Sequence, residues 1–527
     1  MEVFEIVIAL LLGGAGLAAL ARRVSTPYPA LVAVAGAALA LVPRMPELVL
    51  DPGLALALFV APVLLDAAFD ASPRDLRTNW RAVTSLALGA VALTVVVVAV
   101  VTRTLVPAIP WAAAIALGAI VAPPDAAAAT AVLKQLRPPH RLLVILEGES
   151  LFNDASALLI YRIAVGAAVT GFVSGWRLVP MVVFVTAGSV ILGLLLSRVM
   201  LVVTARIEDV STAVISQFCG TFAVWLLAER LHLSGILTMV VFAMATSRRA
   251  ADVIPARIRV PSYAVWEVAV FVLNLLAFIL VGFQLRMIVA RGGWQQYLGV
   301  AVAVTVATIV ARIAWVTAAA AFSRWRCRPR PDGRPGPKDA VALDPRSAAV
   351  VGWCGMRGTV TLAAALALPE SFPYRDLILF TAFAVVLGTL VLQGVTLRPL
   401  LQHLRLEDDG QVEREVRLAR VETLRAALAA TEKCPGAETA ELVRRRYELL
   451  LRRAEQELAS DDGAAGGEPA IPAELAADAQ VIRVATAAER HRLTALRADG
   501  TIGDAAFQQI EQELDLEELD LQQLMRA

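Results

Sequence analysis

The chain has 527 residues, of which 58% are hydrophobic and 18% are charged, and its formal net charge is +1. A soluble globular domain has about 25% charged residues, so this composition excludes an ordinary soluble fold. The four cysteines have no paired spacing, which argues against a disulfide framework or a zinc site. Charge-poor runs recur up to about residue 400, each close to the ~20 residues with which a helix crosses a bilayer. Because these runs are too long for barrel strands, the sequence predicts an all-α polytopic membrane protein.

Thirteen apolar segments follow one another in the first part of the chain. They cover roughly residues 3–21, 29–43, 53–71, 82–102, 111–133, 142–169, 178–203, 210–229, 233–247, 264–285, 297–322, 347–368 and 377–398. If the loop after the first segment is cytoplasmic, the cytoplasmic loops up to residue 346 hold 20 Lys and Arg, and the outer loops hold 7. This asymmetry follows the positive-inside rule. We therefore expect about 13 transmembrane helices in the cell inner (plasma) membrane, with the N-terminus outside.

Two of these segments are interrupted. The fifth contains Pro123 and Pro124, and the twelfth contains Gly352, Gly355 and Gly358. Proline removes a backbone donor and glycine lowers the cost of unwinding, so both segments are predicted to be broken helices. Broken backbone at membrane depth is tolerated where it lines a polar cavity. An offset of seven segments makes the two run in opposite directions, as the inverted repeats of transporters do.

The composition changes after about residue 403. Charged residues become dense there, and Leu and Ala recur at helical spacing in 411–430 and 436–458. Residues 460–472 are rich in Asp, Gly and Ala and are typical of a flexible linker. The sequence therefore predicts a transmembrane domain over residues 1–402 and a cytoplasmic helical domain over residues 403–527.

The sixth segment carries several polar side chains at one depth. An ionisable side chain in hydrocarbon costs about 3 kcal/mol on insertion scales, so such a group indicates a functional site. In a helix, Ser150 and Asp154 lie on one face at positions i and i+4, and Asn153 lies beside them. Hydroxyl, amide and carboxylate oxygens are the ligands that hard cations prefer. These three residues are therefore candidate ligands for a monovalent cation.

The fifth segment supplies two further candidates. Asp125 follows Pro124, where an unwound turn frees backbone carbonyls such as that of Pro124. Desolvation favours a protonated carboxyl group and a bound cation favours a carboxylate, so such a site can hold either a proton or a cation. That mutual exclusion is the chemical basis of cation–proton exchange.

Other intramembrane charges are less specific. Asp66, in the third segment, either contributes an oxygen to the ion or faces water at the end of its helix. Glu149 and Arg357 are interpreted as a buried ion pair that braces the two broken elements. Arg312 also needs an acidic partner, which the sequence does not identify.

These motifs resemble those of the NhaP-type sodium/proton antiporters, bacterial and archaeal relatives of the sodium/hydrogen exchangers. Residues 147–154 are similar to the signature EGESLxND, and residues 355–360 are similar to the motif G(L/M)RGxV. The resemblance covers roughly residues 5–400 and includes Pro62 to Asp66, Ala228-Glu229, Ser234 to Leu237 and Phe278 to Gln284.

The resemblance implies a homodimer in which a core domain moves against a dimerisation domain. It also implies that Asp154 and Asp125 bind the ion, that Ser150 and Asp66 assist, and that Asn153 marks the electroneutral branch. Two departures bear on selectivity. The usual Thr-Asp-Pro is here Pro124-Asp125-Ala126, and an Asp stands at position 66 where close relatives often have Glu.

We therefore predict a secondary antiporter that exchanges Na⁺ or Li⁺ for H⁺, with no cofactor, no catalytic residue and no nucleic-acid partner. A K⁺/H⁺ antiporter on the same scaffold is the alternative. An aspartyl protease would need a GxGD-like context, which neither Asp125 nor Asp154 has. A passive channel would show ion flux that is not coupled to protons.

Overall fold

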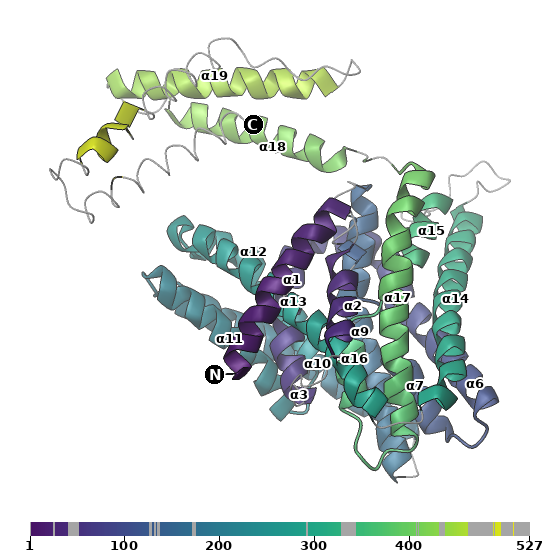
Figure 1. Ribbon diagram of the computed structural model, residues 1–527. Helices are drawn as coiled ribbons and strands as arrows, with labels where there is room; N and C mark the ends of the chain where they lie inside the picture. The colour runs from purple at the N-terminus through teal and green to yellow at the C-terminus, as the bar shows by residue number, and fades with distance from the viewer. Residues whose placement is uncertain are drawn as a thin grey trace, which may run out of the picture. The chain divides into compact units, whose positions relative to one another are not determined.

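The computed structural model describes most of the chain, and the described residues form helices and the segments that connect them, with no strand (Figure 1). The described residues are 2–24, 27–40, 52–125, 129–130, 133, 138–170, 175–290, 294–327, 344–406, 408, 410–431, 438–461, 488–489, 491–496 and 510. The all-α fold is therefore confirmed. Contacts divide the chain into two units, Met1–Asp409 and Gly410–Ala527.

The described helices of the first unit follow the apolar segments of the sequence in order, except that residues 73–81, which were expected to form a loop, are also helical. They are α1 (Glu2–Val24), α2 (Tyr28–Ala40), α3 (Pro52–Ala55), η1 (Leu56–Val60), α4 (Ala61–Asp70), α5 (Pro73–Thr84), η2 (Ser85–Ala90), α6 (Val91–Leu105), α7 (Trp111–Val121), α9 (His140–Thr170), α10 (Gly175–Thr204), α11 (Val210–Arg230), α12 (Gly235–Val253), α13 (Ala256–Ala290), α14 (Trp294–Cys327), α15 (Pro345–Trp353), α16 (Thr359–Leu366) and α17 (Arg375–Leu404). The elements η1 and η2 are π-helical turns inside longer helices.

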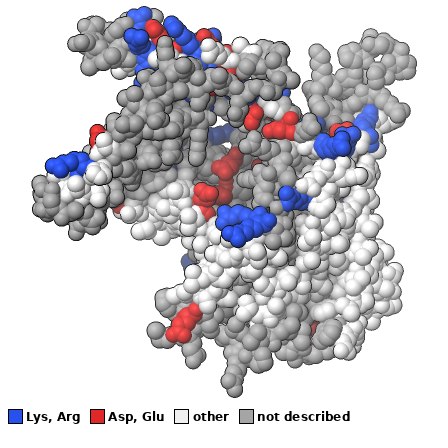
Figure 2. All heavy atoms as spheres, turned by 45° about the horizontal axis from the view of Figure 1, so that its top comes forward, with Lys and Arg blue, Asp and Glu red and all other residues white. Residues whose placement is uncertain are grey.

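Several helices are long and apolar enough, by length and composition, to cross a membrane. Among the described residues these are Pro73–Leu105, Pro180–Thr204, Val210–Arg230, Ala256–Leu280, Gln295–Arg326 and Arg375–Leu404. On α10, the apolar side chains of Val183, Phe184 and Ile191 are 60–66% exposed. Apolar surface of this kind suits lipid contact. Figure 2 also shows a broad area with neither acidic nor basic side chains.

Local signals set where the helices begin. Ser234 starts α12 by accepting a hydrogen bond from the N–H of Leu237, at 3.3 Å. Ser72 does the same for α5, which continues with Pro73 at its first position. These caps satisfy donors that have no partner within the helix.

Both predicted breaks are confirmed. Helix α7 ends at Val121, and residues 122–125 are not helical. Helix α15 ends at Trp353, and residues 354–358 run as irregular backbone before α16 begins. The first break coincides with the Pro123-Pro124 pair, and the second lies within the glycine-rich stretch.

Packing brings these breaks into the middle of the first unit. Helix α7 packs against α6 and α9, and α14 packs against α6, α15 and α17 (Figure 1). A buried cluster on η1, α4, α11 and α12 contacts the other side of α9 through Ala155 and Leu158, and contacts α16 through Val360. The two broken segments and α9 therefore lie between well-packed helices.

The second unit contains two described long helices, α18 (Gln411–Thr431) and α19 (Glu438–Asp461), which pack against each other. Val421 and Ala454 are buried within this unit. Arg425 reaches Glu455 across the pair at 2.7 Å. The helical character expected of the tail is thus present in these two segments. The expected linker at 460–472 falls almost entirely outside the described residues.

Candidate ion site at the broken helices

The two broken segments are joined by a backbone hydrogen bond. The N–H of Asp125, at the end of the first break, donates to the carbonyl of Met356 in the second break, at 2.7 Å. In both segments, unwinding leaves backbone groups without partners in their own helix. The bond between the breaks satisfies two of these groups and places Asp125 against the second segment. We call residues 122–125 and 354–358 together the crossing.

Arg357 stabilises the end of α7. Its Nε donates to the carbonyl of Val121 at 2.9 Å, and its Nη2 donates to the carbonyl of Ala122 at 3.1 Å. Its Nη1 also donates to the carbonyl of Gly355. A helix carries partial negative charge at its C-terminal end, which favours a cation there. The Arg357 guanidinium, which is fully buried, therefore caps α7 inside the protein.

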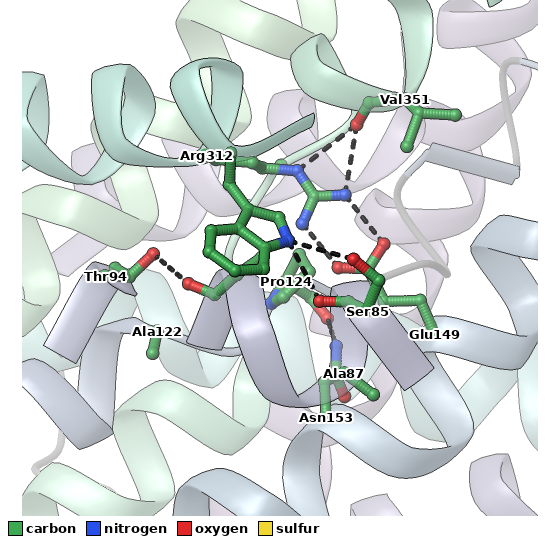
Figure 3. Close-up of polar contacts among 12 residues, drawn as sticks. Ser85, Ala87, Thr94, Ala122, Pro124, Glu149, Asn153, Arg312 and Val351 are labelled. Atoms are coloured by element: carbon green, nitrogen blue, oxygen red, sulfur yellow. Dashed lines mark hydrogen bonds and ion pairs between the residues drawn. The ribbon is translucent and has the colours of Figure 1, made fainter. Parts of the chain in front are cut away.

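The acidic partner of Arg312 is Glu149. The Nη1 and Nη2 atoms of Arg312 lie 2.5 and 2.8 Å from the two carboxylate oxygens of Glu149, and both side chains are at most 2% exposed (Figure 3). Arg312 also donates from Nε and Nη2 to the carbonyl of Val351, at 3.2 and 3.1 Å. It thus caps α15 as Arg357 caps α7.

The predicted ion pair of Glu149 with Arg357 is therefore corrected. Glu149 pairs with Arg312, and Arg357 binds main-chain carbonyls. The expectation that Glu149 braces a broken element is retained in part, because Arg312 contacts α15. Both arginines are fully buried basic residues, and the spacing of the sequence gave no means to choose between them.

Two glycines allow the close contacts of the crossing. A Cβ atom at Gly358 would overlap the carboxylate of Asp125. A Cβ atom at Gly355 would overlap the side chain of Arg312 and approach Nη1 of Arg357 to 3.0 Å. Asp125 therefore lies directly against the residue that precedes α16, whose N-terminal end favours negative charge.

Helix α9 meets the crossing through Asn153. Its Nδ2 donates to the carbonyl of Pro124 at 2.9 Å (Figure 3). The Asn153 side chain is fully buried, and its Oδ1 has no hydrogen-bond partner among the described residues. The structure thus brings together the candidate ligands Asn153 and Pro124. The Pro124 carbonyl accepts the hydrogen bond of the Asn153 amide.

The carboxylate of Asp154 is buried, with 6% of the residue exposed, and lies close enough to Asp125 to interact with it electrostatically. Ser150, one turn earlier on α9, is half-buried, as is Asp66 on α4. Among the described residues, no three acidic, histidine or cysteine side chains converge to hold a metal ion.

Some residues around the site escaped sequence reasoning. The hydroxyl of Ser156 donates to the carbonyl of Ala87 at 2.6 Å, and Nε1 of Trp315 donates to the carbonyl of Ser85 at 3.0 Å. Both acceptors belong to the π-helical turn η2, where the regular helical bonds are interrupted. No local motif predicts such a turn. A serine that faces the interior next to the signature was the available hint.

Comparison with known proteins agrees with this geometry. The sodium/hydrogen exchanger transmembrane family matches residues 6–403. An uncharacterized Na(+)/H(+) exchanger of Mycobacterium tuberculosis is 30% identical over 521 residues, which cover 95% of this chain and 93% of that protein. A sodium, potassium, lithium and rubidium/H(+) antiporter of Bacillus subtilis is 31% identical over 398 residues, which cover 70% of this chain and 57% of that protein.

The fold matches that of a solved antiporter. The sodium proton antiporter MjNhaP1 from Methanocaldococcus jannaschii superimposes with a TM-score of 0.60 and 15% identity, covering 77% of this chain and 100% of that chain. The predicted resemblance to NhaP-type antiporters is therefore confirmed. The protein is a membrane transporter and not an enzyme, and it belongs to the sodium/hydrogen exchanger family.

Proposed function

We propose that this protein exchanges Na⁺, or Li⁺, for H⁺ at one shared site formed by Asp154 and Asp125. The observation that supports this most is the buried position of Asp154 near Asp125, beside two interrupted helices. Two carboxylates at short range repel each other when both are ionised, so the pair favours a bound proton or a bound cation. Competition for the same oxygens couples the two ions without a cofactor.

Neighbouring groups would complete the coordination shell. The half-buried hydroxyl of Ser150 lies one turn before Asp154 on α9. Asn153 and the Pro124 carbonyl lie at the crossing, and Oδ1 of Asn153, which has no partner in the part of the chain that the structure describes, is an available acceptor. The half-buried carboxylate of Asp66 on α4 would add a third acid. The neutral Asn153 stands beside Asp154, where a second aspartate would add a charge, and this supports electroneutral exchange of one proton for one cation.

Alternating access would expose this site to one side of the membrane at a time. The crossing lies between packed helices, and transporters of inverted-repeat architecture move such a unit against its neighbours. We also propose that the protein is a homodimer in the plasma membrane. Its N-terminus would lie outside the cell and its tail in the cytoplasm. Labelling of single cysteines placed in the tail, in intact cells and in inverted vesicles, would test this orientation.

A K⁺/H⁺ antiporter is the second candidate. The Bacillus subtilis relative is named for sodium, potassium, lithium and rubidium, so related chains differ in their ions. The shorter Asp at position 66 and the Pro-Asp-Ala sequence at the first break both alter the oxygens available to the ion.

Proton flux in proteoliposomes tests the function directly. We expect that added Na⁺ or Li⁺ moves protons in the wild type and that Asp154→Asn abolishes this response. Asp70→Asn is the matched control, because Asp70 is an exposed acid at the end of α4 and should keep full exchange. A stronger response to K⁺ would favour the second candidate. Full exchange by a well-folded Asp154→Asn protein would refute the site assignment.

A further inference from the structure

One face of α17 lies along the second broken segment. The hydroxyl of Thr389 accepts a hydrogen bond from the N–H of Arg357 at 3.0 Å. Seven residues later, the hydroxyl of Thr396 accepts a bond from Nε1 of Trp353 at 2.9 Å. Helical periodicity places Gln393 between these two contacts on the same face. A Cβ atom at the adjacent Gly394 would lie 3.0 Å from Cγ of Pro27 and 3.5 Å from the sulfur of Met356. Gln393 therefore faces residues 353–357.

Gln393 is fully buried, and its amide is unpaired. The residue has 0% of its surface exposed, and neither Oε1 nor Nε2 has a hydrogen-bond partner among the described residues. The hydroxyls of Thr381 on the same helix and of Thr361 on α16 are also buried without a partner in the described part of the chain, but other buried threonines are paired. Thr389 and Thr308 each donate to the carbonyl four residues earlier in their own helix, at 2.7 Å. A buried amide without a partner is unfavourable, and an apolar side chain of similar shape would avoid that cost. Stability of this conformation alone therefore does not explain why a glutamine occupies position 393.

The position of Gln393 suggests a role in a second conformation of the protein. The segment beside it contains Met356, whose carbonyl accepts the N–H of Asp125. If Asp125 moved on binding a cation, its hydrogen bond to Met356 would move residues 353–357 with it, relative to α17. A side chain that has no hydrogen bond in one conformation and gains one in another stabilises the second conformation.

We propose that Gln393 is a positioning residue for ion binding: its amide binds the backbone of residues 353–357 when the site holds a cation. This inference rests on the ion site proposed above. Gln393 does not contact the ion. It acts through the segment that holds Asp125, and it raises cation affinity because its hydrogen bonds form only in the loaded conformation.

Gln393→Met tests this, because methionine has a similar length and forms no comparable hydrogen bonds. We would measure the thermal stability of the purified full-length protein in choline chloride and in NaCl, and the cation KM of exchange in proteoliposomes. We expect the Tm in choline to be equal to or above that of the wild type, the NaCl-induced rise in Tm to shrink, and KM to increase about fivefold with little change in maximal rate. Gln393→Leu serves if the methionine variant folds poorly.

Thr238→Val is the matched control. Thr238 on α12 is also fully buried, its hydroxyl has no partner within the described ranges, and it lies in a different group of helices. This variant should keep the wild-type KM and NaCl response. A Gln393→Met protein with unchanged KM and NaCl response would overturn the inference. So would a lower Tm in choline, since the amide would then be a constant structural contact. If the wild type itself responds to no cation, the proposed ion site fails and the inference fails with it.

Discussion

The buried arginines Arg312 and Arg357, which contact the two broken helices, are compensated by different groups. Arg312 is neutralised by the carboxylate of Glu149, whereas Arg357 is held by the carbonyls of Val121, Ala122 and Gly355. Removing one partner of a buried ion pair leaves an uncompensated charge, which is more damaging than loss of an exposed pair. We therefore predict that Glu149 contributes to the stability of the fold and does not bind the ion.

Glu149→Gln should destabilise the protein by about 3–5 kcal/mol, because the Arg312 guanidinium would stay buried without a counter-charge. Thermal unfolding in detergent would measure this. Glu229→Gln is a matched control, since the half-exposed pair of Glu229 with Arg162 should contribute only about 0.2–1 kcal/mol. Replacing both partners, Glu149→Leu with Arg312→Met, should recover part of the loss. Equal stability of the two single variants would contradict the assignment.

Gly358→Ala should reduce exchange about tenfold or more, because the added methyl group would displace the carboxylate of Asp125 and misplace an ion ligand. The initial rate of Na⁺-dependent proton flux would measure the effect. Gly299→Ala is the control, as nothing lies within 4 Å of a Cβ atom at that position. Wild-type rates in the Gly358→Ala protein would show that Asp125 can move aside without loss.

At the scale of helices, the sequence predicted the interruptions but not their contacts. Pro123 and Pro124 block regular helical bonds, and the second break lies within the run that contains Gly355 and Gly358, so composition alone located both. The bond from Asp125 to Met356 joins residues 231 positions apart, and no local pattern encodes that distance. The partner of Glu149 was missed for the same reason. The π-helical turns depend on neighbouring side chains and have no sequence signal of their own.

Helix α11 offers a test that depends on pH. Asp209 caps this helix by accepting hydrogen bonds from the N–H and the hydroxyl of Thr212, at 2.8 and 2.9 Å. These bonds, the backbone bond above all, hold the pKa of Asp209 below its ordinary value. A carboxylate with a lowered pKa stabilises the fold above its unfolded pKa of about 4, and this contribution disappears as the pH falls through the folded value.

Asp209→Ala should therefore lower Tm at neutral pH, and the difference from the wild type should shrink as the pH falls below about 4. Thermal scans in detergent across this range would follow it. Glu208→Ala, at the exposed neighbouring acid, should show no such profile. A difference that grows toward acidic pH would have the wrong sign for a cap of this kind.

At the scale of the whole molecule, every residue of the candidate ion site belongs to the unit Met1–Asp409. The second unit has its own buried residues and its own ion pairs, such as Arg425 with Glu455. A chain truncated after Asp409 should therefore keep cation-dependent proton flux that Asp154→Asn abolishes. Loss of flux in a truncated protein with wild-type Tm would show that the tail takes part in exchange.

The two arginine caps also have a consequence for protein engineering. Arg357 and Arg312 donate hydrogen bonds to carbonyls at the C-terminal ends of α7 and α15. The partial negative charge at these helix ends is therefore compensated by groups other than the candidate ion ligands. The acids at positions 66, 125 and 154 are then separable from the scaffold that presents them. A combinatorial library limited to these three positions should yield many folded members. Selecting it on different salts would measure how much ion selectivity can change while the rest of the membrane domain stays the same.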